Sequence, residues 1–215
     1  MPSMTSETTN APRTYHRSEV VVVYRTKESF GGLSNMASGF PLRINGMRIP
    51  TSEALYQACR FPHRPEVQQV IIRQNSPMTA KMKGKPYRKD SRPDWDHVRT
   101  RIMRWCLRVK LAQNYEEFGR LLLATVGRPI VELSRKDDYW GAKASGIAEG
   151  TLIGQNILGR LLMELRDLRQ HDTEDRLKTV LPLNIPNFLL LGQPIEAVTA
   201  DRDTHELRAR QTRLL

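Results

Sequence analysis

Apolar residues follow two patterns along the chain, a strand-like pattern before residue 50 and a helical pattern after it. The β-branched run at residues 20–24 is typical of a buried strand. Residues 40–44 and 47–49 flank Asn45-Gly46, the preferred pair for a tight two-residue turn. They therefore predict a β-hairpin. A further short strand is expected at residues 130–133.

From residue 53 onward the apolar positions recur every three to four residues, which predicts a series of helices. Their expected starts are marked by cap residues or first-turn prolines, at Pro50, Pro65, Ser76, Asp94, Asn114 and Asn156. Val70 and Leu168 belong to the faces expected to be buried. Cys59 and Cys106 also fall on apolar faces and are expected to be reduced core residues of an intracellular protein.

The chain divides into three parts by composition. Residues 1–19 are polar and predict a disordered extension, and residues 20–170 predict one compact domain. Residues 171–215 form a second extension, whose segment 181–192 is apolar and contains prolines. We expect this segment not to be helical and to pack across the domain or against a second subunit, which would make a homodimer.

The formal net charge of +11 favours polyanionic partners, either nucleic acid or ligands that carry phosphates. The segment 81–104 is strongly basic, and it is either a solvated face or a phosphate-contacting surface. The sequence has no apolar run of membrane-spanning length, no phosphate-binding glycine loop and no metal-ligand spacing of cysteine and histidine. We therefore expect a cytoplasmic protein with no membrane contact, no metal and no cofactor.

Four residues are candidates for chemistry. Glu53 lies in the first turn of an expected helix with Gln57 one turn later, and either stabilises the helix start or serves a polar pocket. Lys110 ends the long helix at the border of its apolar stripe, where it either snorkels or has a depressed pKa suited to a nucleophile. Trp140 is either a stacking platform or a core-edge residue. Asn156 can cap the last helix beside an anion site.

Several fragments occur in a specific order: Leu33-Ser34-Asn35, Pro50-Thr51-Ser52-Glu53, Tyr56-Gln57-Ala58, Arg108-Val109-Lys110, Val131-Glu132, Asp138-Tyr139-Trp140-Gly141 and Asn156-Ile157-Leu158-Gly159. In this order and spacing, residues 20–170 resemble the YbiA-like (NADAR) family of N-glycosidases. The resemblance implies a compact, mostly helical α+β domain with a small antiparallel sheet or hairpin. The family's pocket positions fall on Asn35, Glu53, Lys110, Glu132, Asp138, Trp140, Gly141 and Asn156.

The resemblance also implies hydrolysis of the N-glycosidic bond between ribose C1 and an amine nitrogen. The substrates associated with the family are ribosylamino-pyrimidine phosphates of riboflavin synthesis and ADP-ribose attached to guanine, in nucleotides, DNA or RNA. The chain departs from the family pattern at Leu33, Ala54 and Leu111, which replace an aromatic residue, a histidine and a phenylalanine. The loop between Gly141 and Asn156 is also longer and less rich in glycine. These departures bear on substrate identity more than on reaction type.

Such a reaction builds positive charge on the ribose, so it needs a carboxylate and a proton donor for the amine. Glu53 is the first candidate for the carboxylate and Asp138 the second. Lys110, its pKa lowered by burial and by neighbours such as Arg104 and Arg108, could capture C1 as a Schiff base. Trp140 would stack on the base.

Two other functions compete with the enzyme. One is a catalytically silent module that binds ADP-ribose or a related nucleotide in the same pocket. The other is a nucleic-acid-binding protein whose basic segment 81–104 makes the contacts, with steep salt dependence. The basic charge explains neither Glu53 nor the Asp-Tyr-Trp-Gly stretch, so the glycosidase ranks first.

Overall fold

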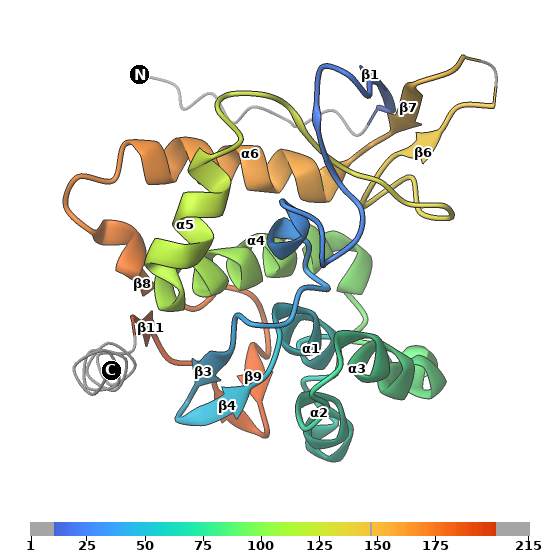
Figure 1. The fold of residues 1–215 in the computed structure, drawn as a ribbon. Coiled ribbons are helices and arrows are strands. Elements are labelled where there is room, and N and C mark those ends of the chain that lie inside the picture. The colour runs from blue at the N-terminus through green and yellow to red at the C-terminus, as the bar shows by residue number, and fades with distance from the viewer. Residues whose placement is uncertain (1–10, 147, 201–215) are drawn as a thin grey trace, which may run out of the picture.

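The computed structural model describes residues 11–146 and 148–200. Its helices are arranged around α4, which packs against α1, α5 and α6. Figure 1 shows α6 on one side of α4 and α1, α2 and α3 on the other. The α-helices of the described residues are α1 (Ser52–Ala58), α2 (Pro65–Ile72), α3 (Pro77–Gly84), α4 (Trp95–Gln113), α5 (Tyr115–Leu123) and α6 (Ile157–Gln170). Within the same described residues, the short 3-10 helices are η1 (Gly31–Leu33), η2 (Lys85–Asp90) and η3 (Arg176–Lys178).

The strands form several small sheets. Strand β2 (Val21–Val23) pairs in parallel with β5 (Ile130–Glu132), and β3 (Leu42–Ile44) forms the expected antiparallel hairpin with β4 (Met47–Ile49). A three-stranded antiparallel sheet has the order β1 (Arg13–His16), β7 (Thr151–Gly154), β6 (Lys143–Ala144). The remaining pairs are β8 (Thr179–Val180) with β11 (Val198–Thr199), and β9 (Leu189–Leu190) with β10 (Gln193–Pro194). The α+β fold class is confirmed.

Local sequence signals explain where the helices begin. Thr51 is the N-cap of α1, and its hydroxyl accepts a hydrogen bond from the Ala54 amide at 3.2 Å. Ser76 caps α3 in the same way, ahead of Pro77. Asp94 and Asn114 stand at the N-cap positions of α4 and α5, but neither side chain bonds the helix it precedes. The Asp94 carboxylate pairs with Arg92 instead.

The structure corrects three of the sequence-based expectations. Residues 13–16 were expected to be disordered, but they form β1, because β7 offers them an edge to pair with. The segment between Gly141 and Asn156 was expected to be a loop, and it contains the hairpin of β6 and β7. Val70 and Leu168 were expected to be buried, and they are 40% and 39% exposed. Residues 1–10 and 201–215 lie outside the described part.

The C-terminal extension packs across the domain, as expected, and its described part contains no α-helix. The indole Nε1 of Trp105 on α4 donates to the Leu181 carbonyl at 3.0 Å, and Gln68 on α2 donates to the Leu189 carbonyl at 3.0 Å. The ring of Trp105 also contacts that of Phe188 edge to face. The extension therefore joins α2 and α4. A contact with a second subunit stays a prediction.

Cys59 and Cys106 are buried and free, as expected. Among the described helices, none is both long enough and apolar enough to span a membrane.

Candidate active site

Glu53 lies buried in the first turn of α1, 5% exposed. Its two carboxylate oxygens accept hydrogen bonds from Asn35 Nδ2 at 2.6 Å and Gln57 Nε2 at 2.9 Å. Burial raises the pKa of Glu53, while the charge of Lys81 and the two amide donors act in the opposite direction. Amide donors on both oxygens favour the ionised form, whereas burial, the larger effect, favours the carboxylic acid.

Asn35 belongs to the loop that follows η1. The hydroxyl of Ser52 donates to the Asn35 carbonyl at 3.3 Å, which ties this loop to the start of α1. The Oδ1 atom of Asn35 is shielded from solvent and has no hydrogen-bond partner among the described residues. A buried acceptor without a partner is costly, and a donor group on a ligand would satisfy it.

Glu132 ends strand β5 and supplies a second carboxyl group. Its Oε1 accepts from the Ser34 hydroxyl at 3.4 Å, and its Oε2 is shielded without a partner in the described part of the chain. Burial raises the pKa of Glu132 to about 7, and the negative charges of Glu53 and Asp137 act in the same direction. Near neutral pH this group therefore exists partly as a carboxylic acid that can donate a proton.

Lys110 is fully buried on α4 and does not line the cavity between Glu53 and Trp140. Its Nζ donates to the carbonyls of Gly32 at 2.7 Å and Ser34 at 3.1 Å, and lies over the rings of Phe40 and Phe118. Burial lowers the pKa of Lys110 to about 7, opposed by the charge of Glu132. The lowered pKa agrees with the prediction. Its cause is burial alone, not the expected basic neighbours.

Trp140 lies at the cavity wall and is partly buried. Its ring meets those of Tyr56 and Tyr139 edge to face, with centroids 5.6 and 5.0 Å apart. Gly141 follows, and a Cβ there would lie 2.3 Å from the Glu132 carbonyl oxygen. Only glycine therefore allows the Trp140 loop to approach β5 so closely.

Asn156 and Asp138 are not among the residues that line this cavity. Asn156 adopts a left-handed backbone, and its buried side chain accepts from the Glu132 amide at 3.0 Å and donates to the Ile130 carbonyl at 2.8 Å. It thus positions β5 instead of capping α6 or lining the cavity. Asp138 is exposed, pairs with Lys143 at 2.5 Å and lies outside this cavity.

Its neighbour Asp137, which the sequence reasoning missed, lines the cavity and accepts from the amides of Tyr139 and Trp140 at 3.0 and 2.9 Å. An aspartate two residues before an aromatic is the pattern of a side chain that caps its own turn. That signal was present in the sequence.

The cavity has a volume of about 370 Å³. It brings together five of the predicted residues, Asn35, Glu53, Glu132, Trp140 and Gly141. It also contains four basic side chains that were not predicted individually, Arg60, Lys81, Arg88 and Arg99. The guanidinium of Arg60 lies 4.8 Å from the Trp95 ring centroid, and that of Arg99 lies 3.9 Å from the Tyr139 centroid. Acidic groups and positive charge thus share one cavity.

Comparison with known proteins gives the family. The model of the NADAR domain matches residues 22–169, more than half of the chain. The chain belongs to the NADAR family. N-glycosidase YbiA of Escherichia coli is 37% identical over 151 residues, which cover 69% of this chain and 87% of that protein. A riboflavin biosynthesis protein of Vibrio vulnificus is 32% identical over 154 residues, covering 70% of this chain and 39% of its own length.

The fold of this NADAR protein is similar to a solved structure. The NMR structure of E. coli YbiA superimposes with a TM-score of 0.57 at 36% sequence identity, covering 70% of this chain and 85% of that one. The residues that build the cavity all lie within the NADAR match, whereas the C-terminal extension, which begins at residue 171, lies outside it.

The raised pKa of Glu132 predicts a pH-dependent effect of Glu132→Gln on stability. The folded-state pKa is about 7 and the reference value is 4.5, so the folded state holds a proton that the unfolded state releases between these values. This contribution to stability is present below pH 4.5 and is lost as the pH rises through 7. Urea unfolding should therefore show the variant gaining stability relative to wild type as the pH rises from 4.5 to 8. A constant difference would contradict the assignment.

Proposed function

We propose that this NADAR protein is an N-glycosidase that hydrolyses the bond between ribose C1 and an amine nitrogen. The observation that carries the proposal is a pair of carboxyl groups around one cavity, buried Glu53 with both oxygens bonded to amides and partly buried Glu132 with a shielded, unpartnered Oε2 among the described residues. The name of the E. coli relative, N-glycosidase YbiA, supports the same reaction class.

The two carboxyl groups fit the two requirements of this reaction. We assign Glu53, whose two oxygens accept from amide donors, the carboxylate role: in its ionised form it stabilises the cationic ribose or orients the attacking water. Glu132, with a pKa of about 7 and a free Oε2, gives its proton to the departing nitrogen. The C1–N bond breaks, water adds its oxygen to C1, and the proton lost by the water restores the acid.

The basic side chains of the cavity fit a substrate that carries phosphate. Arg60, Arg88 and Lys81 lie in the same cavity as Glu53. Guanidinium groups bind phosphate oxygens well because their donors form a planar fork. Trp140 offers an aromatic surface for the base. We therefore propose as substrates ADP-ribose linked to guanine, or a ribosylamino-pyrimidine phosphate, the latter supported by the name of the V. vulnificus relative.

A side-by-side assay tests the function and ranks the substrates. ADP-ribosylated guanine in DNA, the corresponding mononucleotide and ribosylamino-pyrimidine phosphate are each incubated with the protein, and the released base is measured by chromatography. We expect release from at least one, with kcat/KM falling above about pH 7 as Glu132 loses its proton. Binding of all three without release would instead support a silent nucleotide-binding module.

The nucleic-acid-binding alternative has one observation in its favour. Lys81, Arg88 and Arg99, all from the basic segment 81–104, lie in the same cavity as the carboxyl groups. We propose that these residues serve the modified nucleotide in the cavity. A binding protein without chemistry would bind unmodified DNA or RNA tightly, with steep salt dependence, and Glu53→Gln would not affect it.

A further inference from the structure

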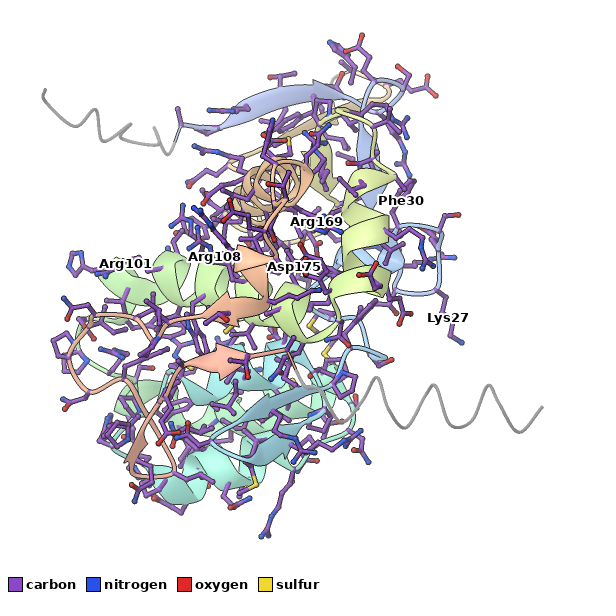
Figure 2. The ribbon with its side chains drawn as sticks, turned by 90° about the vertical axis from the view of Figure 1, so that its left-hand side faces the viewer. Lys27, Phe30, Arg101, Arg108, Arg169 and Asp175 are labelled. Carbon is purple, nitrogen blue, oxygen red and sulfur yellow. The ribbon has the colours of Figure 1, made fainter. Side chains whose placement is uncertain are left out.

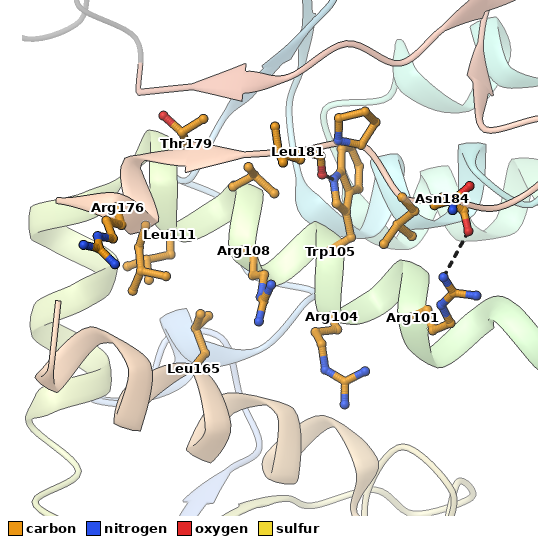
Figure 3. A pocket seen from close by; sticks show the side chains of 14 residues that line it. Arg101, Arg104, Trp105, Arg108, Leu111, Leu165, Arg176, Thr179, Leu181 and Asn184 are labelled. Carbon is orange, nitrogen blue, oxygen red and sulfur yellow. Dashed lines mark hydrogen bonds between the residues drawn. The ribbon is translucent and has the colours of Figure 1, made fainter. Parts of the chain in front are cut away.

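A second concave site lies between α4, α6 and the C-terminal extension. This groove has a volume of about 510 Å³, within the range of small-molecule sites. Figure 3 shows the extension, residues 176–184, along one wall and Leu165 of α6 along the other. Because the extension lies beyond the NADAR match, which ends at residue 169, one wall of this groove lies outside the matched domain, and its α4 and α6 residues lie within it.

The groove and the catalytic cavity use different faces of α4. Arg99 and Met103 line the catalytic cavity, whereas Arg101, Arg104 and Arg108 line the groove. Each residue advances about 100° around an α-helix, so Arg99 and Arg101 point about 200° apart. The three groove arginines are spaced by three and four residues and form one stripe. Figure 2 shows Arg101 and Arg108 on the same side of the molecule.

Positive charge in the groove exceeds the negative charge that contacts it. Arg104 Nε bonds both oxygens of Glu164 at 3.0 and 3.1 Å, and Arg108 Nη2 lies 3.9 Å from the same carboxylate. Arg101 donates a hydrogen bond to the Asn184 carbonyl at 3.1 Å. Within the described residues, its hydrogen-bond partner is therefore a neutral group. The Nε of Arg108 is shielded and has no partner in the described part of the chain. Among the described residues, Glu164 thus contacts two of the three guanidinium groups of the stripe. The fourth arginine of the lining, Arg176, is paired with Glu174, so the groove keeps an excess of positive charge.

The rest of the lining is aliphatic. Leu177 and Leu183, which are partly exposed, form the leucine floor, and Leu181, which is 70% exposed, stands at the rim. The buried side chains of Leu111, Leu165 and Val180 complete the apolar lining. The aromatic residue Trp105 is 2% exposed and already donates its Nε1 hydrogen to Leu181, so it offers no face on which a base could stack. The floor therefore suits an aliphatic body better than a nucleobase.

We propose that this groove binds a small anionic amphiphile, with a phosphate head on the arginine stripe and an aliphatic body on the leucine floor. The residues 101–111 of α4 span about 15 Å, which sets the length available to the ligand. The phosphate dianion matches the charge excess, and its oxygens accept from forked guanidinium donors. The site is separate from the catalytic cavity and does not depend on the reaction proposed for it.

The three tryptophans of the chain report on the two sites separately. Trp95 and Trp140 line the catalytic cavity, and Trp105 lines the groove. The full-length protein labelled with ¹⁵N is titrated with decyl phosphate below its micellar concentration, and the indole N–H signals are followed. We expect the Trp105 signal to shift and saturate, while those of Trp95 and Trp140 stay in place. Decanol and decyltrimethylammonium at equal concentrations should leave Trp105 unchanged.

Charge variants test the assigned contacts. Arg108→Gln should weaken decyl phosphate binding about tenfold, and Glu164→Gln should tighten it by releasing the two arginines. Arg73→Gln, an exposed position at the end of α2, is the matched control and should bind as wild type. Unchanged apo spectra confirm that each variant is folded. The proposal is wrong when Trp105 does not respond, when Trp95 and Trp140 respond with it, or when Arg108→Gln binds as wild type.

Discussion

Glu53→Gln is expected to lower kcat/KM for base release by about 10²–10³-fold, the typical loss when one group that stabilises transition-state charge is removed. The substitution keeps the size of the side chain and removes the negative charge that opposes the cation on the ribose. The side-chain NH2 group of Asn35 or of Gln57 would then face the NH2 group of the new glutamine, which is also a donor, in place of a carboxylate oxygen. Removing a buried charge offsets that loss, so thermal unfolding should change little. Released base and circular dichroism are measured on the same sample.

The matched control is Asp138→Asn, which removes a carboxylate from the neighbouring surface. Asp138 is exposed, and its contact is an ion pair with Lys143 outside the catalytic cavity. Exposed ion pairs contribute little to stability, so kcat/KM and unfolding should both stay within about twofold of wild type. Inactivity of Asp138→Asn together with full activity of Glu53→Gln would reverse the two assignments.

Local signals in the sequence predicted the local elements. Thr51 before Ser52, and Asn45-Gly46 between two apolar runs, specify a capped helix and a hairpin without help from distant residues. The sheet of β1, β7 and β6 was missed because its pairing is not local. Thr14 pairs with Ile153, and nothing within residues 13–16 identifies that partner.

The sequence predicted several of the residues that form the site, but not the directions in which their side chains point. The ordered fragments identified Asn35, Glu53 and Glu132, which the fold brings to one cavity. Asp137 and Asp138 are adjacent in sequence, and their side chains leave the loop in different directions, one to the cavity and one to Lys143. The sequence signal for this choice of direction is the turn-capping pattern at Asp137, two residues before Tyr139. That choice follows from the backbone bonds that Asp137 makes to its own turn.

Lys110→Met is expected to destabilise the fold and slow the reaction through the loop that carries Asn35. Methionine keeps the length of the side chain but cannot donate to the Gly32 and Ser34 carbonyls. An unsatisfied buried carbonyl costs about 1–3 kcal/mol, so a measurable loss of unfolding free energy should follow. Because these carbonyls precede Asn35, which holds Glu53 at 2.6 Å, kcat should fall by about 10-fold or more.

The loss of stability in Lys110→Met should depend on pH, and this dependence should show that it arises from titration of the Lys110 amine. The folded pKa of Lys110 is about 7 and its reference value is 10.5, so the unfolded state holds more protons between these values. Wild-type stability from this group therefore rises as the pH increases from 7 to 10.5, and Lys110→Met lacks the rise. Urea unfolding should show a larger difference between the two proteins at pH 9 than at pH 7.

Borohydride trapping separates this positioning role from the Schiff base that the sequence suggested. The buried Nζ is held by two carbonyls behind the cavity wall, so wild-type protein reduced during turnover should show no ribosyl adduct on Lys110 by peptide mass spectrometry. An adduct at Lys110, with Lys110→Met inactive yet as stable as wild type, would make the lysine the nucleophile. The positioning role and the nucleophile role thus predict different results in two independent measurements: the presence of a covalent ribosyl adduct on Lys110, and the stability of Lys110→Met as a function of pH.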